Sequence, residues 1–143
     1  MEKVLVNDEP ENQCFGCSPH NERGLRMTFV QTGPKTIESR YEVAPHMCGP
    51  PNVIHGGVQA VLLDEAIGMA ARVGAGLDSP HVVTAEFELR YRRPAPIESP
   101  ITVRGELIRV EGQNLFVEGS ILSPEGETLT TARARWRALS GLE

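Results

Sequence analysis

Several features that mark large classes of protein are missing from this 143-residue chain. No apolar run approaches the roughly 20 residues that a helix needs to cross a bilayer. The amino-terminal stretch MEKVLVNDEPENQ is acidic and lacks the charged and then apolar layout of a signal peptide. Basic residues are not in excess, because the net charge is -5. We therefore expect neither a membrane nor a nucleic acid as partner.

Cysteine is also scarce, and the three residues at positions 14, 17 and 48 do not make a disulfide framework. A reducing cytoplasm is therefore the expected location. Aromatic residues make up only 5% of the chain, which neither supports nor excludes a pocket for an aromatic group. The length favours a single domain over residues 1–143. Within it, residues 1–24 are expected to form a lead-in loop, since they are rich in Asn, Glu, Pro and Gly and show no periodicity.

The rest of the chain alternates apolar and polar residues as strands do, with one helical interruption. The predicted strands cover residues 25–30, 36–44, 82–92, 101–110, 115–122 and 128–139. The one clear helix runs from about Gly56 to Val73 and is stopped by Gly74-Ala-Gly76. Connections among the last four strands are mostly too short for crossovers, so the sheet should be largely antiparallel. This order predicts an α+β fold, with one long helix packed on a sheet of about six strands.

The stretch NVIHGGVQAVLLDEAIGMAA, residues 52–71, places Asp64 in the middle of the most apolar helix. A buried acid is costly unless it is paired or used in chemistry. Asp64 shares a narrow helix face with small residues. These are Gly57, Ala60, Gly68 and Ala71. Another group can approach the helix closely at this face, so Asp64 either pairs with an arginine there or is catalytic.

The His-Gly-Gly turn at residues 55–57 favours the catalytic alternative. A helix amino terminus has backbone N–H groups without partners, and glycine lets a ligand touch them. Such a site suits a carbonyl oxygen that becomes an oxyanion. Gly57 and Asp64 are, however, about 10 Å apart along the axis, at about 1.5 Å per residue. A catalytic Asp64 therefore requires a second chain whose helix start supplies the oxyanion donor.

Two motifs resemble those of hot-dog-fold acyl-CoA thioesterases, in particular the phenylacetate-pathway type and its relatives. They are GPPNVIHGGVQAVLLDEAIG, which begins at Gly49, and VVTAEFELRYRRPAP, which begins at Val82. The upstream CFGCSPHNERGL resembles a lead-in common in the same group. The resemblance covers most of the chain. It implies the hot-dog fold, in which a sheet wraps one long central helix, and hydrolysis of an acyl-CoA thioester to a free acid and CoA.

The resemblance also implies roles for individual residues. Asp64 matches the acid that acts on the thioester carbonyl, either as general base on water or as nucleophile. The oxyanion N–H falls at the His-Gly-Gly turn, with Gly56 as first choice and Gly57 as second. Glu65 lies about 100° around the helix from Asp64. It is interpreted as an ion-pair or interface residue, and the alternative is that Glu65 is the catalytic acid. No cofactor or bound metal is expected, because coenzyme A enters only as part of substrate and product.

Three further residues complete the implied site. Thr84 matches a Ser or Thr that positions the water or the carboxylate, and His55 is expected to orient the turn or the thioester. Some relatives carry a polar residue shortly before the histidine. This chain has Gly49 at that position, so Asn52 is the nearest substitute. The predicted assembly is a homodimer or a dimer of dimers, and the sequence does not decide between them.

Two groups outside this site have alternative interpretations. Arg90, Arg92 and Arg93 could bind the phosphates of coenzyme A, since arginine binds phosphate in a bidentate manner. They also fit a solvated strand face, because Arg90 and Arg92 alternate with glutamates. Cys14-x2-Cys17, together with His20, His46 or Cys48, offers soft ligands for zinc. The alternative is that the Cys14–Cys17 segment is a loop that folds over the sheet edge or the acyl pocket.

Two other functions are compatible with this sequence. A hot-dog dehydratase acting on a hydroxyacyl thioester needs a histidine and a carboxylate, and His55 lies nine residues before Asp64. A non-catalytic acyl-CoA-binding module would bind the ester without releasing thiol. The sequence does not identify the acyl group.

Overall fold

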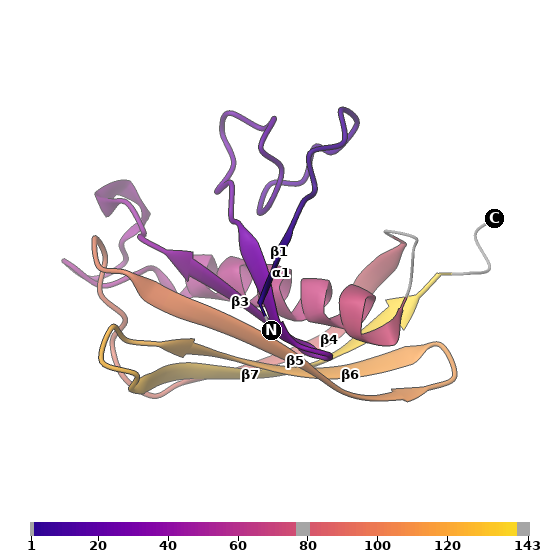
Figure 1. Ribbon diagram of the computed structural model, residues 1–143. Coiled ribbons are helices and arrows are strands. Elements are labelled where there is room, and N and C mark those ends of the chain that lie inside the picture. The colour runs from indigo at the N-terminus through magenta and orange to yellow at the C-terminus, as the bar shows by residue number, and fades with distance from the viewer. Residues whose placement is uncertain (1, 77–80, 140–143) are drawn as a thin grey trace.

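One helix packs across a single seven-stranded antiparallel sheet in the computed structural model, which describes residues 2–76 and 81–139. Helix α1 spans Gly56–Ala75. The strands are β1 (Lys3–Leu5), β2 (Phe29–Gly33), β3 (Thr36–Tyr41), β4 (Val82–Tyr91), β5 (Ile101–Glu111), β6 (Asn114–Leu122) and β7 (Thr128–Ala138). A short 3-10 helix, η1 (Pro45–Met47), precedes α1. Figure 1 shows α1 lying on the concave side of the sheet. The predicted α+β fold is confirmed.

The strands follow the order β1-β2-β3-β5-β6-β7-β4 across the sheet. Strand β4 directly follows α1 along the chain but pairs with β7, at the far edge. One side of β4 therefore has no strand partner in the described part of the chain. In the same part of the chain, no helix combines the length and apolar character that a membrane crossing requires.

The amino-terminal segment departs from the predicted loop. Residues 3–5 form β1, which pairs with β2, so the sheet has seven strands where about six were expected. Three residues are too few to show an alternating pattern, and this strand forms because the edge of β2 offers it partners. The strand predicted at 25–30 begins only at Phe29, since Arg26 has a left-handed backbone (φ 54°) that interrupts the extended chain.

Both ends of α1 are capped by residues of the predicted motifs. At the start, the His55 side chain accepts a hydrogen bond from the Gly57 N–H. The helix runs two residues past the predicted end at Val73, because Gly74 is helical and Gly76 has the left-handed conformation (φ 72°) that closes it. The amide of Gly76 donates to the carbonyls of Arg72 and Val73.

Strand β4 does not alternate strictly. Its register with β7 shifts between Thr84 and Glu86, which leaves Ala85 as the extra residue of a bulge. Val82, Thr84 and Phe87 consequently share the face toward the helix, whereas strict alternation separates Thr84 from Phe87. Thr84 reaches α1 because of this bulge. The sequence pattern gave no sign of it.

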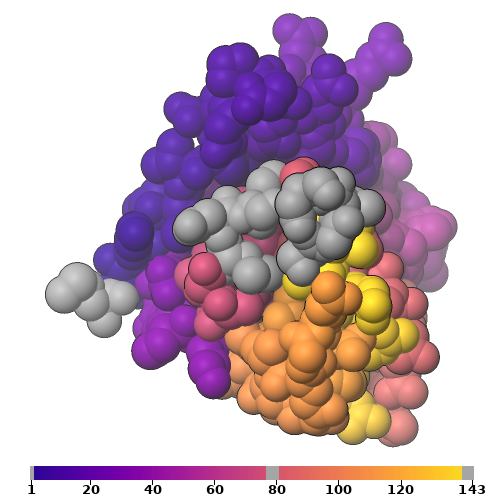
Figure 2. Space-filling view, turned by 90° about the vertical axis from the view of Figure 1, so that its right-hand side faces the viewer, coloured from indigo at the N-terminus to yellow at the C-terminus, as the bar shows by residue number. Residues whose placement is uncertain are grey.

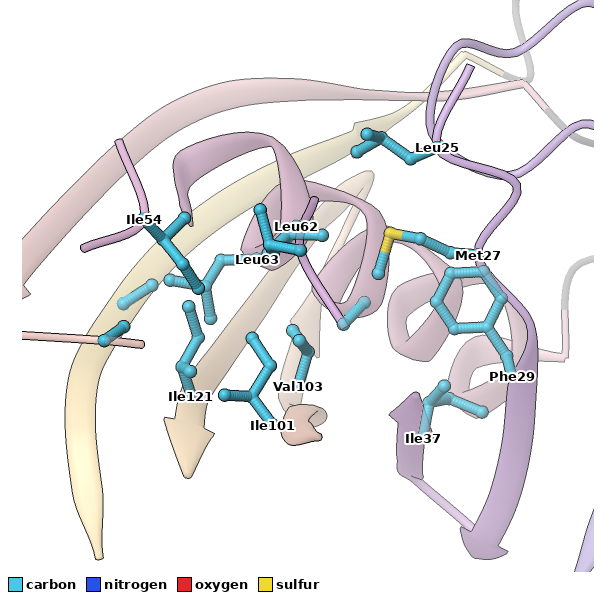
Figure 3. Packing of buried hydrophobic residues seen from close by; sticks show 14 of the residues in the cluster. Leu25, Met27, Phe29, Ile37, Ile54, Leu62, Leu63, Ile101, Val103 and Ile121 are labelled. Atoms are coloured by element: carbon cyan, nitrogen blue, oxygen red, sulfur yellow. The ribbon is translucent and has the colours of Figure 1, made fainter. Parts of the chain in front are cut away.

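The core lies between α1 and the concave face of the sheet. Figure 3 shows helix residues Leu62 and Leu63 above side chains from β5 and β6. Close approach of the layers depends on Gly105 of β5, where a Cβ would lie 2.5 Å from the carbonyl oxygen of Ala66. Gly68 of α1 similarly accommodates the indole of Trp136. At the carboxyl end of α1, the sheet thus packs against the face of small residues that the sequence predicted.

Candidate active site

Asp64 projects from the middle of α1 toward strand β4. Its Oδ1 accepts a hydrogen bond from the Thr84 hydroxyl at 2.7 Å. None of the ion pairs among the described residues includes Asp64. The arginine pairing considered as the alternative is therefore not found in the described structure.

The Asp64 carboxylate borders a cavity of about 370 Å³ on the surface of the chain. The other lining groups are mainly apolar and include Phe15, Ala60, Val61 and Phe87. Burial raises the pKa of Asp64, and the hydrogen bond from Thr84 partly opposes this rise. An acid with a raised pKa is a stronger base once it is ionised. The arrangement suits proton abstraction beside an apolar-lined cavity.

The Gly56 N–H is an unoccupied backbone donor at the start of α1. His55 Nδ1 accepts the Gly57 N–H at 2.9 Å, so this nitrogen carries no proton. The Gly57 N–H is therefore already used as part of the helix cap. No hydrogen bond of the Gly56 N–H is found among the described residues. Of the two glycines considered as oxyanion donors, Gly56 has the N–H that remains available.

Two contacts that the sequence analysis did not assign hold the helix start in place. The Tyr91 hydroxyl, at the end of β4, donates to the Gly56 carbonyl at 2.8 Å. The Thr130 hydroxyl of β7 bonds the buried Gln59 side chain, whose amide nitrogen donates to the Ile54 carbonyl. Tyr91 belongs to the VVTAEFELRYRRPAP motif on which the predicted resemblance rests, but the sequence assigned it no role.

Asn52 lies in the turn before the helix. Its backbone is left-handed (φ 67°), a conformation that asparagine adopts more readily than most residues. Its carbonyl accepts a hydrogen bond from the Ile97 N–H at 3.3 Å. No side-chain hydrogen bond of Asn52 is found in the described residues, so its visible contribution is to the shape of the turn.

The three arginines of the β4 end separate into two environments. Arg90 and Arg92 line a cavity of about 530 Å³ with Arg104 and Arg133, on the sheet face opposite the helix. Glutamates from β4, β5 and β6 line the same cavity, so its charge is mixed. Arg93 instead forms an exposed ion pair with Glu127 at 3.3 Å.

Glu65 contacts the lead-in segment. The Cys14 thiol donates to its Oε1 at 2.6 Å. Burial, and next this hydrogen bond, raise the pKa of Glu65 to about 8. Interaction with the neighbouring Cys17 thiol, and next burial, raise the pKa of Cys14, whereas interaction with Cys14 lowers the pKa of Cys17.

The other sulfur and imidazole candidates for metal binding lie elsewhere. His20 contacts the Asp8 carbonyl at 2.7 Å, and Cys48 forms an isolated bridge with Ile54 beside the helix start. Neither residue joins Cys14 and Cys17 in a group of possible ligands.

A family model described as "Thioesterase superfamily" matches residues 51–130, which include α1, β4 and the β5–β6 hairpin. The chain belongs to this superfamily. The predicted resemblance is thereby confirmed.

Individual relatives agree with this assignment. The acyl-coenzyme A thioesterase THEM4 of Rattus norvegicus is 33% identical over 103 residues, 72% of this chain and 43% of that protein. The chain spans less than half the length of the curated relatives that it matches. The crystal structure of protein RHA08564, a thioesterase superfamily protein, is 26% identical with a TM-score of 0.78, over 87% of this chain and 60% of that chain. The PaaI protein of the E. coli phenylacetic acid degradation operon shares the fold, with a TM-score of 0.70 at 18% identity, over 79% and 83% of the two chains.

Proposed function

We propose that this protein hydrolyses an acyl-coenzyme A thioester to a free acid and coenzyme A. The observation that carries the proposal is the Asp64 carboxylate, held by Thr84 at 2.7 Å and facing an apolar-lined cavity. Membership of the thioesterase superfamily and similarity to an acyl-coenzyme A thioesterase support the substrate class.

In the proposed reaction, Asp64 takes a proton from water, and the oxygen of that water attacks the thioester carbonyl. Alternatively, Asp64 attacks the carbonyl itself and water then hydrolyses the resulting anhydride. In both routes the carbonyl oxygen gains negative charge, which the Gly56 N–H stabilises. The carbon–sulfur bond then breaks, and coenzyme A leaves as the thiolate, which takes up a proton from Asp64 in the first route and from water in the second. Thr84 fixes the carboxylate, and His55 fixes the turn that presents the donor.

The two catalytic groups must come from two chains. Gly56 and Asp64 are eight residues apart on one helix, or about 12 Å at about 1.5 Å per residue, whereas one thioester needs both within about 3 Å. One edge of strand β4 has no strand partner in the described part of the chain. Val83 and Tyr91 lie near the two ends of this strand, and their exposed fractions are 43% and 53%. A second copy that pairs along β4 would cover these side chains. We therefore propose a homodimer, which can pair further into a tetramer.

We further propose that Arg90 and Arg92 receive phosphate groups of coenzyme A. Their support is the cavity that both line, and neither forms any of the ion pairs found among the described residues. The other two arginines of this cavity are paired, Arg104 with Glu38 and Arg133 with Glu88. Arg93 is a weaker candidate, because Glu127 already pairs with it. The double variant Arg90→Gln/Arg92→Gln should raise KM for an acyl-CoA while leaving kcat within about threefold. An unchanged KM would assign both arginines to the solvated surface.

The proposed hydrolysis requires no cofactor beyond the coenzyme A of the substrate. We also propose a cytoplasmic location, since the three cysteines are free thiols in this structure.

The test is a thiol-release assay over short, long, aromatic and hydroxylated acyl-CoA esters. Asp64→Asn should reduce kcat by about 100- to 10,000-fold without loss of folding, because it removes the base. Glu65→Gln should retain activity within about tenfold. Near-normal turnover by Asp64→Asn would refute the assignment, and the reverse order of the two variants would move the base to Glu65. Enoyl formation without thiol release would instead indicate a dehydratase, and tight binding without either product would indicate a binding module.

A further inference from the structure

A second cluster of chemically reactive side chains lies one helix position beyond the catalytic acid. The Sγ atoms of Cys14 and Cys17 and a carboxylate oxygen of Glu65 all lie within 4.8 Å of one another. Two of these groups come from the lead-in segment and the third from α1, 51 residues away from Cys14. Among residues 2–76 and 81–139, these three side chains form a group of His, Cys, Asp or Glu residues close enough to share a metal ion.

The local structure keeps the two sulfur atoms together. The Ser18 N–H donates to the Cys14 carbonyl at 3.1 Å, which closes a tight turn over Cys14–Ser18. The Asn12 side chain accepts the Cys14 N–H at 3.0 Å, and the Asn7 amide donates to the Cys17 carbonyl at 3.0 Å. The turn is therefore anchored by the residues before it and does not depend on the Cys14–Glu65 contact alone.

Gly16 provides the space through which Glu65 reaches the turn. A Cβ at Gly16 would lie 2.0 Å from Glu65 Oε1 and 2.2 Å from its Cγ. Any side chain at this position would displace the carboxylate from the sulfur atoms. The Cys-Phe-Gly-Cys sequence thus provides two thiols and, at Gly16, the space that lets the Glu65 carboxylate lie beside them.

No positively charged side chain is paired with this cluster among the described residues. Glu65 is largely buried and forms none of the ion pairs found among the described residues. A cavity of about 500 Å³ adjoins the cluster and is lined by Cys14, Cys17 and Glu65. Arg72 lines this cavity too, but it forms no ion pair with Glu65. A carboxylate and two thiols in this setting lack a positive partner, and a divalent cation would supply one.

We propose that Cys14, Cys17 and Glu65 bind a zinc ion, with water as the fourth ligand. Two thiolates and one carboxylate are a donor set that zinc accepts, whereas magnesium and calcium require oxygen ligands. Tetrahedral zinc holds such ligand atoms about 3.6–3.8 Å apart. The two sulfur atoms and the carboxylate oxygen already lie within 4.8 Å of one another. The distance from Cys14 Sγ to Glu65 Oε1 is 2.6 Å, and it would lengthen by about 1 Å when the ion replaces the proton between them. The adjoining cavity gives water access to the fourth position.

The ion would fasten the lead-in segment to the helix. Figure 2 shows this segment (indigo) gathered on the side of the molecule opposite the β5–β6 hairpin (orange). Cys14, Phe15 and Gly16 also form one wall of the cavity that Asp64 borders. Zinc in this place would fix that wall and lies outside the proposed hydrolytic step.

Metal content and cobalt binding test the site on the full chain. The reduced protein, purified after growth with added zinc, should contain about one zinc per chain. After chelation, added Co²⁺ should give a thiolate-to-cobalt charge-transfer band, and chelation should lower Tm. Cys14→Ser and Cys17→Ser should lose the band and bind Co²⁺ at least tenfold more weakly. Cys48→Ser is the matched control and should behave like the parent.

Glu65→Gln keeps both thiols and the size of the side chain, so it tests the third ligand even if a cysteine variant fails to fold. It should weaken Co²⁺ binding at least tenfold. A reduced parent protein that binds neither ion overturns the proposal. So does a charge-transfer band that is equally strong in Cys14→Ser, since the cobalt ligands would then lie elsewhere.

Discussion

Replacement of Gly56 by proline removes one hydrogen atom that the proposed mechanism needs and leaves most of its surroundings unchanged. Gly56 is the first residue of α1, a position where proline is well tolerated because its missing N–H has no helical partner. The preceding His55 has φ -54° and ψ 136°, which is the extended conformation that a residue before proline prefers. A Cβ at Gly56 would lie 3.5 Å from the Tyr91 ring, an ordinary contact.

The expected effect follows from the loss of one oxyanion donor. Such a loss typically lowers kcat by about 100- to 1000-fold, or about 2.7–4 kcal/mol of transition-state stabilisation. Gly56→Ala is the matched control, because it introduces the same Cβ and keeps the N–H. It should retain kcat within about tenfold. The measurement is steady-state thiol release, with thermal unfolding of both variants to establish that they fold.

A folded Gly56→Pro protein with the turnover of Gly56→Ala would show that the Gly56 N–H is not the oxyanion donor. The same variant also tests the two-chain site. When Asp64→Asn and Gly56→Pro chains are co-expressed with different tags, the purified heterodimer contains one site with both native groups. It should have about half the activity of the parent, although each variant alone is nearly inactive. Absence of recovery would show that both groups act within one chain.

Two further predictions concern the surroundings of the site. Thr84→Val should shift the acid limb of the kcat/KM–pH profile to higher pH, because Asp64 works only when ionised and the Thr84 hydroxyl lowers its pKa; an unshifted limb would contradict this. Gly105→Ala should lower Tm by roughly 4–12 °C, since its Cβ meets the α1 backbone at 2.5 Å and overpacking costs about 1–3 kcal/mol. Gly33→Ala, with ordinary contacts of 3.6 Å, should leave Tm within about 2 °C.

The sequence predicted the long elements well and the short or irregular ones poorly. Helix α1 and strands β5 to β7 carry many apolar residues with a clear period, so their existence followed from pattern alone. Strand β1 has three residues and forms because β2 offers it an edge. The bulge at Ala85 was also missed, since one extra residue in a strand leaves no mark on composition.

For the candidate active site, the sequence was enough to place Asp64 in an apolar helix behind a His-Gly-Gly turn, because spacing along a helix is fixed by its geometry. The partners that these residues meet depend on how distant elements pack. The bulge brings Thr84 onto Asp64, and the packing of β4 brings Tyr91 onto Gly56. These contacts join residues 20 and 35 positions apart, and local sequence rules do not reach that far.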